Sequence, residues 1–305
     1  MGKFFEAMRE KDRPERPRLA WQSVVATPVG THYAIARRAL EAGKSVVVEK
    51  PLATRVCEAS QLVELASRTR RLLMVGHTFE YTAPVLKIKD LISAGELGDI
   101  FYVSSVRANL GLFQRDVNVA WDLGTHDVAI ILKLVGRMPE AVSGQGQSHH
   151  CDRIEDVALI ALHFPNNMIA FIRLSWLDQN KIRRTTIVGS RKMLVYDDTA
   201  IQEKIRVYDK TVKLHRYYDT FGDFQYSYRY GDIYNPRVEE TEPLRTESDQ
   251  LIDCALGLDT PRTDGLNGLR VVSVREAADR SLRTGGKPVS VITEGSEFHG
   301  QPAAR

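Results

Sequence analysis

The sequence predicts an α/β unit with a parallel sheet, followed by an α+β unit with a large, mostly antiparallel open sheet. Two observations lead to this fold class. In the first part of the chain, short apolar strands without polar alternation are separated by helices, which is typical of parallel βαβ units. In the second part, longer runs alternate between apolar and polar residues and are joined by turn signals, which is typical of antiparallel strands.

The first unit contains three predicted strands with helices between them, and at most a short helix at residues 3–11 precedes them. The strands are predicted at residues 23–26, 45–48 and 72–75. Thr31 stands at the position of a helix N-cap, and Gly43 at the position where that helix ends. A second helix is predicted at about residues 55–68. Together these elements form part of a doubly wound α/β domain.

The second unit begins where the pattern changes, at Pro84. Its helices are predicted at residues 85–93, 119–135, 247–256 and 269–284, and its strands at residues 100–109, 157–164, 169–176, 184–188 and 193–196. We therefore divide the chain into two domains, residues 1–82 and residues 83–305.

The composition is that of an ordinary globular protein, with 43% hydrophobic and 27% charged residues. The 42 basic and 39 acidic residues are spread along the chain, so we expect no nucleic-acid partner. No run reaches the ~18 apolar residues of a membrane helix, so we expect no membrane contact and a cytoplasmic location. The three cysteines lie far apart without a C-x-x-C pair, which fits a reducing compartment.

Lys50 is the first candidate for chemistry. It lies at the C-terminal end of a predicted parallel strand, where α/β sheets hold their ligands, and Pro51 follows it. Burial there would lower its pKa and let the amine share a proton with a reacting oxygen. The alternative is an ordinary surface lysine at the end of a strand.

Asp122 and His126 are the second candidates, since a spacing of four residues on the predicted helix puts them on one face. A carboxylate beside an imidazole fixes its tautomer and raises its basicity, which suits a general base. The alternative is a helix N-terminal aspartate with a histidine that is merely packed. Asp127 points about 100° away from His126 on the helix, so it is left out of the site.

Several motifs resemble the Gfo/Idh/MocA family of oxidoreductases. They are VVATPVGTH at residues 24–32, VEKPLA at 48–53 and WDLGTHD at 121–127, supported by GHTFEY at 76–81 and PRTDG at 261–265. The resemblance extends from about residue 20 to residue 290. It implies a partial Rossmann-type parallel sheet in residues 1–82. It also implies an α+β substrate-binding and oligomerisation domain in residues 83–305, and hence a homodimer or homotetramer.

The resemblance implies an NAD(P)-dependent oxidoreductase that transfers a hydride between nicotinamide and a secondary alcohol or ketone of a sugar or nucleotide sugar. It implies catalytic roles for Lys50, Asp122 and His126. The positions that match cofactor-binding residues, for NAD or NADP, are Thr27, Pro28, His32, Glu49, Lys50 and Pro51, and His77 is added because it follows a strand of the same sheet. A threonine-proline turn at a strand end also occurs without any ligand.

Arg107 and Asn109 lie on the strand that enters the second domain, and we expect them to bind substrate hydroxyls. The alternative is a polar sheet face. No metal site is predicted, because the neighbouring residues His149, His150 and Cys151 cannot readily converge on one tetrahedral centre. A tyrosine-rich stretch at residues 221–234 suits stacking on a sugar or nucleotide, or an ordered loop or subunit contact.

The sequence departs from the family at its front, where relatives carry a strand, a Gly-rich turn and a helix. The sole G-x-G, at residues 144–146, lacks a third glycine and follows no parallel strand. We therefore expect an N-terminally truncated member that lacks the main anchor for the cofactor pyrophosphate. The strand at 23–26 would then have an unpaired apolar edge. The alternative function is a non-catalytic sugar-binding or assembly subunit that has lost cofactor binding.

Overall fold

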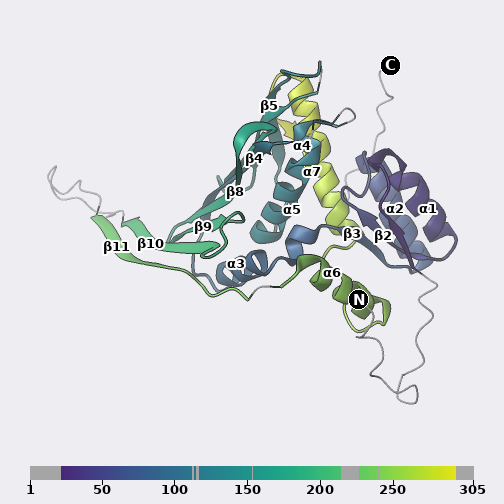
Figure 1. Ribbon diagram of the computed structural model, residues 1–305, viewed down its shortest axis with the longest axis horizontal. Helices are drawn as coiled ribbons and strands as arrows, with labels where there is room; N and C mark the ends of the chain where they lie inside the picture. Colours follow the sequence, from purple (N-terminus) through teal and green to yellow (C-terminus); the bar gives the residue numbers. More distant parts are fainter. Residues whose placement is uncertain are drawn as a thin grey trace, which may run out of the picture.

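The structure is a computed structural model, and it describes residues 22–111, 113–114, 117–152, 154–213, 227–239 and 241–292 (Figure 1). The described residues form two separate sheets. One has the strand order β1-β2-β3, and the other has the order β11-β10-β9-β8-β4-β7-β6-β5-β12. This arrangement confirms the predicted fold class of a partial Rossmann-type parallel sheet followed by an α+β domain.

The first sheet is parallel throughout. It consists of β1 (Gln22–Val25), β2 (Ser45–Glu49) and β3 (Leu73–Gly76), with α1 (His32–Glu41) and α2 (Val56–Thr69) between them. β3 is buried over its whole length, as expected of a parallel strand covered by helices. β1 pairs only with β2 among the described residues, and its Val24 is 68% exposed.

The second sheet is mixed and mostly antiparallel, with β4 and β7 as its parallel pair. Its strands are β4 (Ile100–Leu110), β5 (Ala141–Gln147), β6 (Val157–His163), β7 (Ile169–Ser175), β8 (Leu177–Gly189), β9 (Met193–Asp197), β10 (Ile205–Lys213), β11 (Ser227–Tyr234) and β12 (Val289–Ser290). One face carries the core, because alternate residues such as Ala158, Ile160 and Leu162 are buried while Leu159 between them is 55% exposed.

Five further helices complete the described fold. They are α3 (Ala83–Ser93), α4 (Val119–Asp122), α5 (Gly124–Val135), α6 (Pro243–Ala255) and α7 (Gly265–Arg283). Figure 1 shows α7 running between the two sheets. Its Val271 and Val274 belong to the core of the second sheet, whereas Leu269 and Val272 belong to the core of the first. The domain boundary between residues 82 and 83 stays a prediction, and α7 serves both units.

Some predicted elements differ from the structure. The single helix predicted at residues 119–135 is two helices separated at Leu123. The strand predicted at 184–188 is the end of the much longer β8. Thr31 does occupy the N-cap of α1, but its hydroxyl donates to the carbonyl of Pro28 instead of capping the helix. The helix considered at residues 3–11 lies outside the described residues.

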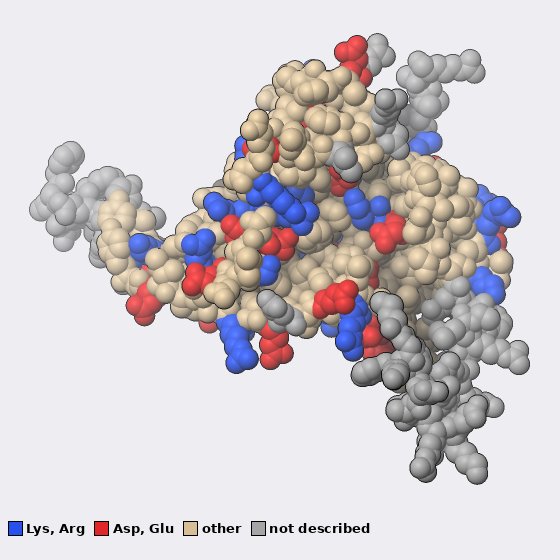
Figure 2. All heavy atoms as spheres, viewed as in Figure 1, with Lys and Arg blue, Asp and Glu red and all other residues tan. Residues whose placement is uncertain are grey.

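Several strands escaped sequence analysis for physical reasons. β5 contains Gly144 and Gly146, which weaken a strand pattern. β11 is the edge strand and is rich in polar and tyrosine residues. β10 beside it places Ile205 and Val207 in the core but continues with polar residues at 209–211. Within the described ranges, no helix combines the length and apolar character needed to cross a membrane. On the face shown in Figure 2, basic and acidic side chains are intermixed.

Candidate active site

The predicted catalytic residues, together with His77 from the predicted cofactor site, come from four elements that meet between the two sheets. Lys50 directly follows β2, and His77 directly follows β3, so both lie at the carboxyl edge of the parallel sheet. Asp122 ends α4, and His126 lies in the first turn of α5. The Lys50 Nζ donates to the backbone carbonyl of Asp122 over 3.2 Å, which joins the two sheets at this point.

Lys50 and Asp122 form a partly buried ion pair. The Nζ of Lys50 lies 3.8 Å from Oδ1 of Asp122, and their side chains are 24% and 29% exposed. Oδ2 of Asp122 accepts a hydrogen bond from the indole of Trp176 over 3.1 Å. Burial lowers the pKa of Lys50, and the carboxylates of Asp122 and Glu49 only partly oppose that effect. The amine is therefore easier to deprotonate than an exposed lysine.

The predicted hydrogen bond between Asp122 and His126 is not formed. The Asp122 carboxylate accepts a hydrogen bond from Trp176 and pairs with Lys50 instead. His126 Nδ1 is buried without a hydrogen-bond partner among the described residues, and its ring lies 4.7 Å from that of Phe79. Burial lowers the pKa of His126 well below its usual range, and the charge of Lys50 adds to this effect. The imidazole is neutral at physiological pH.

His77 lies in the same environment. It is 1% exposed, and neither ring nitrogen finds a partner in the part of the chain that the structure describes. Burial and the charge of Lys50 lower the pKa of His77 to about 3. Buried polar atoms are nearly always hydrogen-bonded in proteins, so three unpartnered imidazole nitrogens in one place point to a bound molecule that satisfies them.

Sequence analysis missed Asp127, which is 2% exposed and holds Arg107 in place. Arg107 Nε donates to Oδ2 of Asp127 over 2.6 Å, and the Ser105 hydroxyl donates to Oδ1 over 2.6 Å. The Arg107 guanidinium also lies 4.6 Å from the centroid of the Phe79 ring. The sequence did contain a signal for a carboxylate partner. Ser105 and Arg107 occupy alternate positions of β4 and lie on its buried face, where a charged side chain needs a partner. Binding of substrate by Arg107 and by the half-buried Asn109 stays a prediction.

The residues predicted to line the cofactor are fixed relative to one another by His32. Its Nδ1 lies 2.8 Å from the carbonyl oxygen of Pro51, and its Nε2 lies 2.8 Å from that of Thr27. The ring thus links the turn at Thr27 and Pro28 to the loop after β2. Both nitrogens of His32 are used within the chain, so its contribution to a ligand site is to hold these two turns.

Glu49 lies across the end of the parallel sheet. A Cβ atom at Gly76 would lie 3.0 Å from the Glu49 carboxylate, so the glycine permits this close approach. Glu49 is exposed, whereas Lys50 next to it turns inward. The described residues do not provide the usual hydrogen-bond donors for a pyrophosphate. They hold no Gly-rich turn between a strand and a helix, and Gly144 and Gly146 lie on antiparallel β5. The residues present fit the reactive end of a nicotinamide cofactor.

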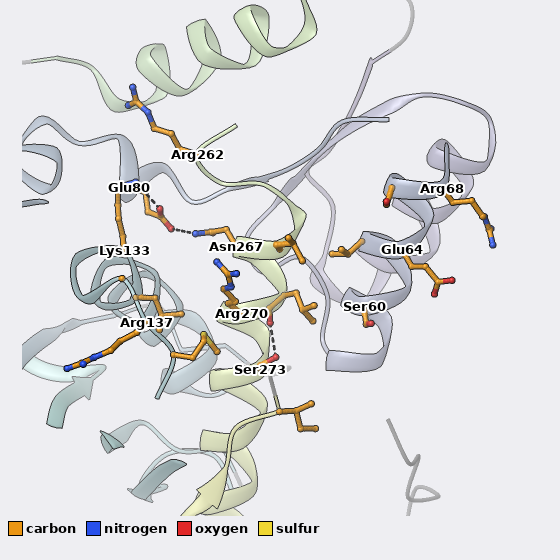
Figure 3. Close-up of a pocket in the computed structure, with 18 residues that line it drawn as sticks. Ser60, Glu64, Arg68, Glu80, Lys133, Arg137, Arg262, Asn267, Arg270 and Ser273 are labelled. Atoms are coloured by element: carbon orange, nitrogen blue, oxygen red, sulfur yellow. Dashed lines mark hydrogen bonds and ion pairs between the residues drawn. The ribbon is translucent and has the colours of Figure 1, made fainter. Parts of the chain in front are cut away.

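A cavity of about 1140 Å³ lies elsewhere, between α2, α5 and α7 (Figure 3). Its wall includes Glu80, which accepts hydrogen bonds from Lys133 and Asn267. Glu80 belongs to the short 3-10 helix η3 (Thr78–Tyr81), which also carries Phe79. Figure 3 shows Arg68 and Arg137 pointing away from the cavity, and none of the predicted catalytic residues lines it. We therefore place the candidate site at Lys50.

The remaining motifs are placed as follows. His149 and His150 each lie within hydrogen-bond distance of the carboxylate of Asp156, and the described residues contain no cluster of three metal-ligating side chains. Residues 221–226 of the tyrosine-rich stretch lie outside the described ranges. Tyr228 and Tyr230 are 62% and 75% exposed on β11.

Acid stability tests the burial of His77. Its pKa is about 3 in the folded chain and ~6.5 in an unfolded one. The unfolded state therefore binds more protons between these values, so the free energy of unfolding falls as the pH drops from ~6.5 toward 3. We expect His77→Gln to make this fall shallower in urea titrations. Equal slopes for the variant and the parent would contradict the buried, neutral His77.

Breaking the Arg107–Asp127 pair tests the support under the site. Asp127→Asn would leave the Arg107 charge buried without its carboxylate, and we expect a loss of about 3–5 kcal/mol in the free energy of unfolding. The matched control is Glu41→Gln, which breaks the exposed Arg37–Glu41 pair and should change little. Comparable losses in the two variants, measured by urea unfolding, would contradict a buried ion pair here.

Comparison with known proteins gives the chain its family. The family model described as "Oxidoreductase family, NAD-binding Rossmann fold" matches residues 9–77. The model described as "GFO/IDH/MocA C-terminal domain" matches residues 85–195. The two models together match more than half of the chain and meet near the junction between its two sheets.

Individual relatives match only in part. The uncharacterized oxidoreductase YdgJ of Escherichia coli (strain K12) is 40% identical over 98 residues, which are 32% of this chain and 28% of that protein. The scyllo-inositol 2-dehydrogenase (NADP(+)) IolW of Bacillus subtilis (strain 168) is 33% identical over 132 residues, which are 39% of this chain and 36% of that protein. The chain thus spans less than half the length of these two relatives.

A solved structure confirms the fold. The WlbA dehydrogenase from Bordetella pertussis, in complex with NADH and UDP-GlcNAcA, is similar with a TM-score of 0.71 at 23% identity, covering 90% of this chain and 80% of that one. With both family models matched and the fold shared, the chain belongs to the Gfo/Idh/MocA family of oxidoreductases, whose N-terminal domain has the NAD-binding Rossmann fold.

Proposed function

We propose that this chain forms the catalytic centre of an NAD(P)-dependent oxidoreductase that acts on a secondary alcohol or ketone of a sugar or nucleotide sugar. The observation that carries the proposal is the partly buried Lys50–Asp122 pair near His77 and His126, whose buried ring nitrogens have no hydrogen-bond partner among the described residues. Such perturbed ionisable groups in a shared site are typical of acid–base catalysis.

The proposed reaction moves a hydride and a proton. When bound, the nicotinamide supplies the hydride acceptor or donor. In the oxidation direction, the substrate hydroxyl must lose its proton to a group of this chain. Lys50 is suited to this step, because burial lowers its pKa while Asp122 holds the amine in place. In the reduction direction the Lys50 ammonium returns the proton to the carbonyl oxygen.

His126 has a different part from the one expected from the sequence. Without a carboxylate partner, a buried imidazole is a weaker base than one paired with Asp122. Its unpartnered Nδ1 can hydrogen-bond a substrate hydroxyl, and so orient it toward Lys50. We therefore assign the proton transfer to Lys50 and the orientation of the substrate to His126.

The substrate class rests on relatives and on the polar groups nearby. IolW is named for scyllo-inositol, and WlbA was solved with UDP-GlcNAcA. Both ligands carry several ring hydroxyls, and Arg107, Asn109 and His126 are the side chains we propose to recognise such groups here. Thr27, Pro28, Glu49, Pro51 and His77 would lie along the cofactor, with His32 fixing the turns.

Kinetics of Lys50→Met test the proposal. The chain is titrated with NADH and NADPH, and hydride transfer is followed with scyllo-inositol and UDP-GlcNAcA as probes. Since Lys50 handles the proton and not the cofactor phosphates, we expect saturable cofactor binding by parent and variant. We also expect kcat/KM of the variant to fall by about 10²–10⁴-fold. The matched control, Lys210→Met, removes an exposed lysine on β10 and should behave as the parent.

Two results would contradict this function. If Lys50→Met kept the parent kcat/KM, Lys50 would not be the proton-transfer group. If the folded parent bound neither cofactor, the chain by itself would not be an enzyme, and the non-catalytic sugar-binding or assembly subunit would be favoured.

The outer face of the nine-stranded sheet supports a homo-oligomer. Leu159 and Phe171 are 55% and 47% exposed there, on neighbouring strands. We propose that copies of the chain pair through this face, as a homodimer or homotetramer, because pairing would remove this apolar surface from water.

Sedimentation tests the proposed assembly. We expect the parent to be a dimer or tetramer and the double variant Leu159→Lys, Phe171→Lys to be a monomer, since charges would be buried in the contact. The control is Ile201→Lys, at an 86% exposed position in the turn between β9 and β10. A monomeric parent, or a double variant with unchanged mass, would contradict this interface.

A further inference from the structure

Arg275 is a fully buried arginine without a hydrogen-bond partner. It lies in the middle of α7 and is 0% exposed. None of its three guanidinium nitrogens has a partner among the described residues. Burial lowers the pKa of Arg275 to about 9, with Asp279 opposing that effect, so the side chain keeps its charge at neutral pH.

Such a charge is unfavourable for stability. An ion taken out of water is normally compensated by a counter-ion or by several hydrogen bonds. The neighbour of Arg275 is instead an aromatic ring, since its guanidinium carbon lies 4.3 Å from the centroid of the Trp121 ring. A cation over an indole is attractive, but the ring satisfies none of the N–H groups. An apolar residue would fill the same place at less cost.

The position of Arg275 connects it to the candidate site. Trp121 directly precedes Asp122 in α4. The carbonyl of Asp122 accepts a hydrogen bond from Lys50, and its carboxylate forms an ion pair with the same amine. At Gly124, which begins α5, a Cβ atom would lie 3.8 Å from Nη1 of Arg275. The guanidinium therefore lies directly against the short segment that carries Asp122.

We propose that Arg275 is a positioning residue, which places a positive charge with no hydrogen-bond partner among the described residues against the Trp121–Gly124 segment and thereby keeps Lys50 ready to give up its proton. This deepens the proposed function, and it rests on that function only for the role of Lys50 in the reaction. The state of Lys50 itself is measurable without cofactor or substrate.

The charges around Lys50 come from every element packed against it. They are Asp122 on α4, Glu49 on β2, Arg107 on β4 and Arg275 on α7, with His77 and His126 as nearby titratable rings. Asp122 and Glu49 favour the ammonium form, whereas Arg107 and Arg275 disfavour it. The charge of Arg107 is balanced by Asp127 at 2.6 Å. Among the described residues, no carboxylate lies within ion-pair distance of Arg275, and Asp279, one turn later on α7, compensates its charge only at longer range. The charge of Arg275 is therefore the less compensated of the two.

The experiment is an NMR titration of Lys50 in the full chain with ¹³C-labelled lysine. The Lys50 signal is identified as the one missing from Lys50→Met. Replacing Arg275 by methionine keeps a long side chain but removes the charge. We therefore expect the Lys50 titration midpoint to rise in Arg275→Met relative to the parent.

The matched control is Arg280→Met, which removes an exposed arginine five residues later on the same helix. It should leave the Lys50 midpoint unchanged. If Arg275→Met does not fold, as judged by circular dichroism, Arg275→Gln takes its place as the neutral variant. The proposal is overturned if the neutral variant and Arg280→Met have the same Lys50 midpoint, because a merely structural arginine would leave that midpoint where it is. Absent hydride transfer would contradict the proposed function but not this result.

Discussion

The contact between Lys50 and Asp122 is the interaction on which the candidate site depends. Lys50 stands at the end of a parallel strand in the first sheet, and Asp122 ends a short helix that packs on the second. The amine donates a hydrogen bond to the backbone carbonyl of Asp122 and forms an ion pair with its carboxylate, and so connects the two units at this point. Burial there, together with the charge of Lys50, lowers the pKa of the neighbouring rings of His77 and His126.

Some of the polar and charged groups around this contact have partners, and others do not. Asp127 satisfies Arg107, and Trp176 together with Lys50 satisfies the Asp122 carboxylate. Arg275, His77 and His126 retain nitrogens without partners among the described residues. Paired groups stabilise the scaffold, whereas unpaired groups raise its energy and are typical of sites that act on a ligand.

The sequence was sufficient for the elements with strong local patterns and for the residues within short motifs. The three parallel strands, the long central strands and the placement of Lys50 at a strand end followed from apolar runs and from a lysine before proline. Contacts made by tertiary packing were not predictable in this way. An ideal helix across residues 119–135 put Asp122 beside His126 and Asp127 outside the site. The break at Leu123 and the partners Trp176 and Arg107 reversed both expectations.

A double-mutant cycle between Lys50 and Asp122 measures whether these two side chains interact. Lys50→Met, Asp122→Asn and the double variant are compared with the parent by their free energies of unfolding, which requires no cofactor. We expect the losses in free energy of unfolding to be non-additive, with a coupling of about 0.5–3 kcal/mol, as found for residues in direct contact. Additive losses would show that the two side chains do not interact, and would contradict a candidate site built on the contact between Lys50 and Asp122.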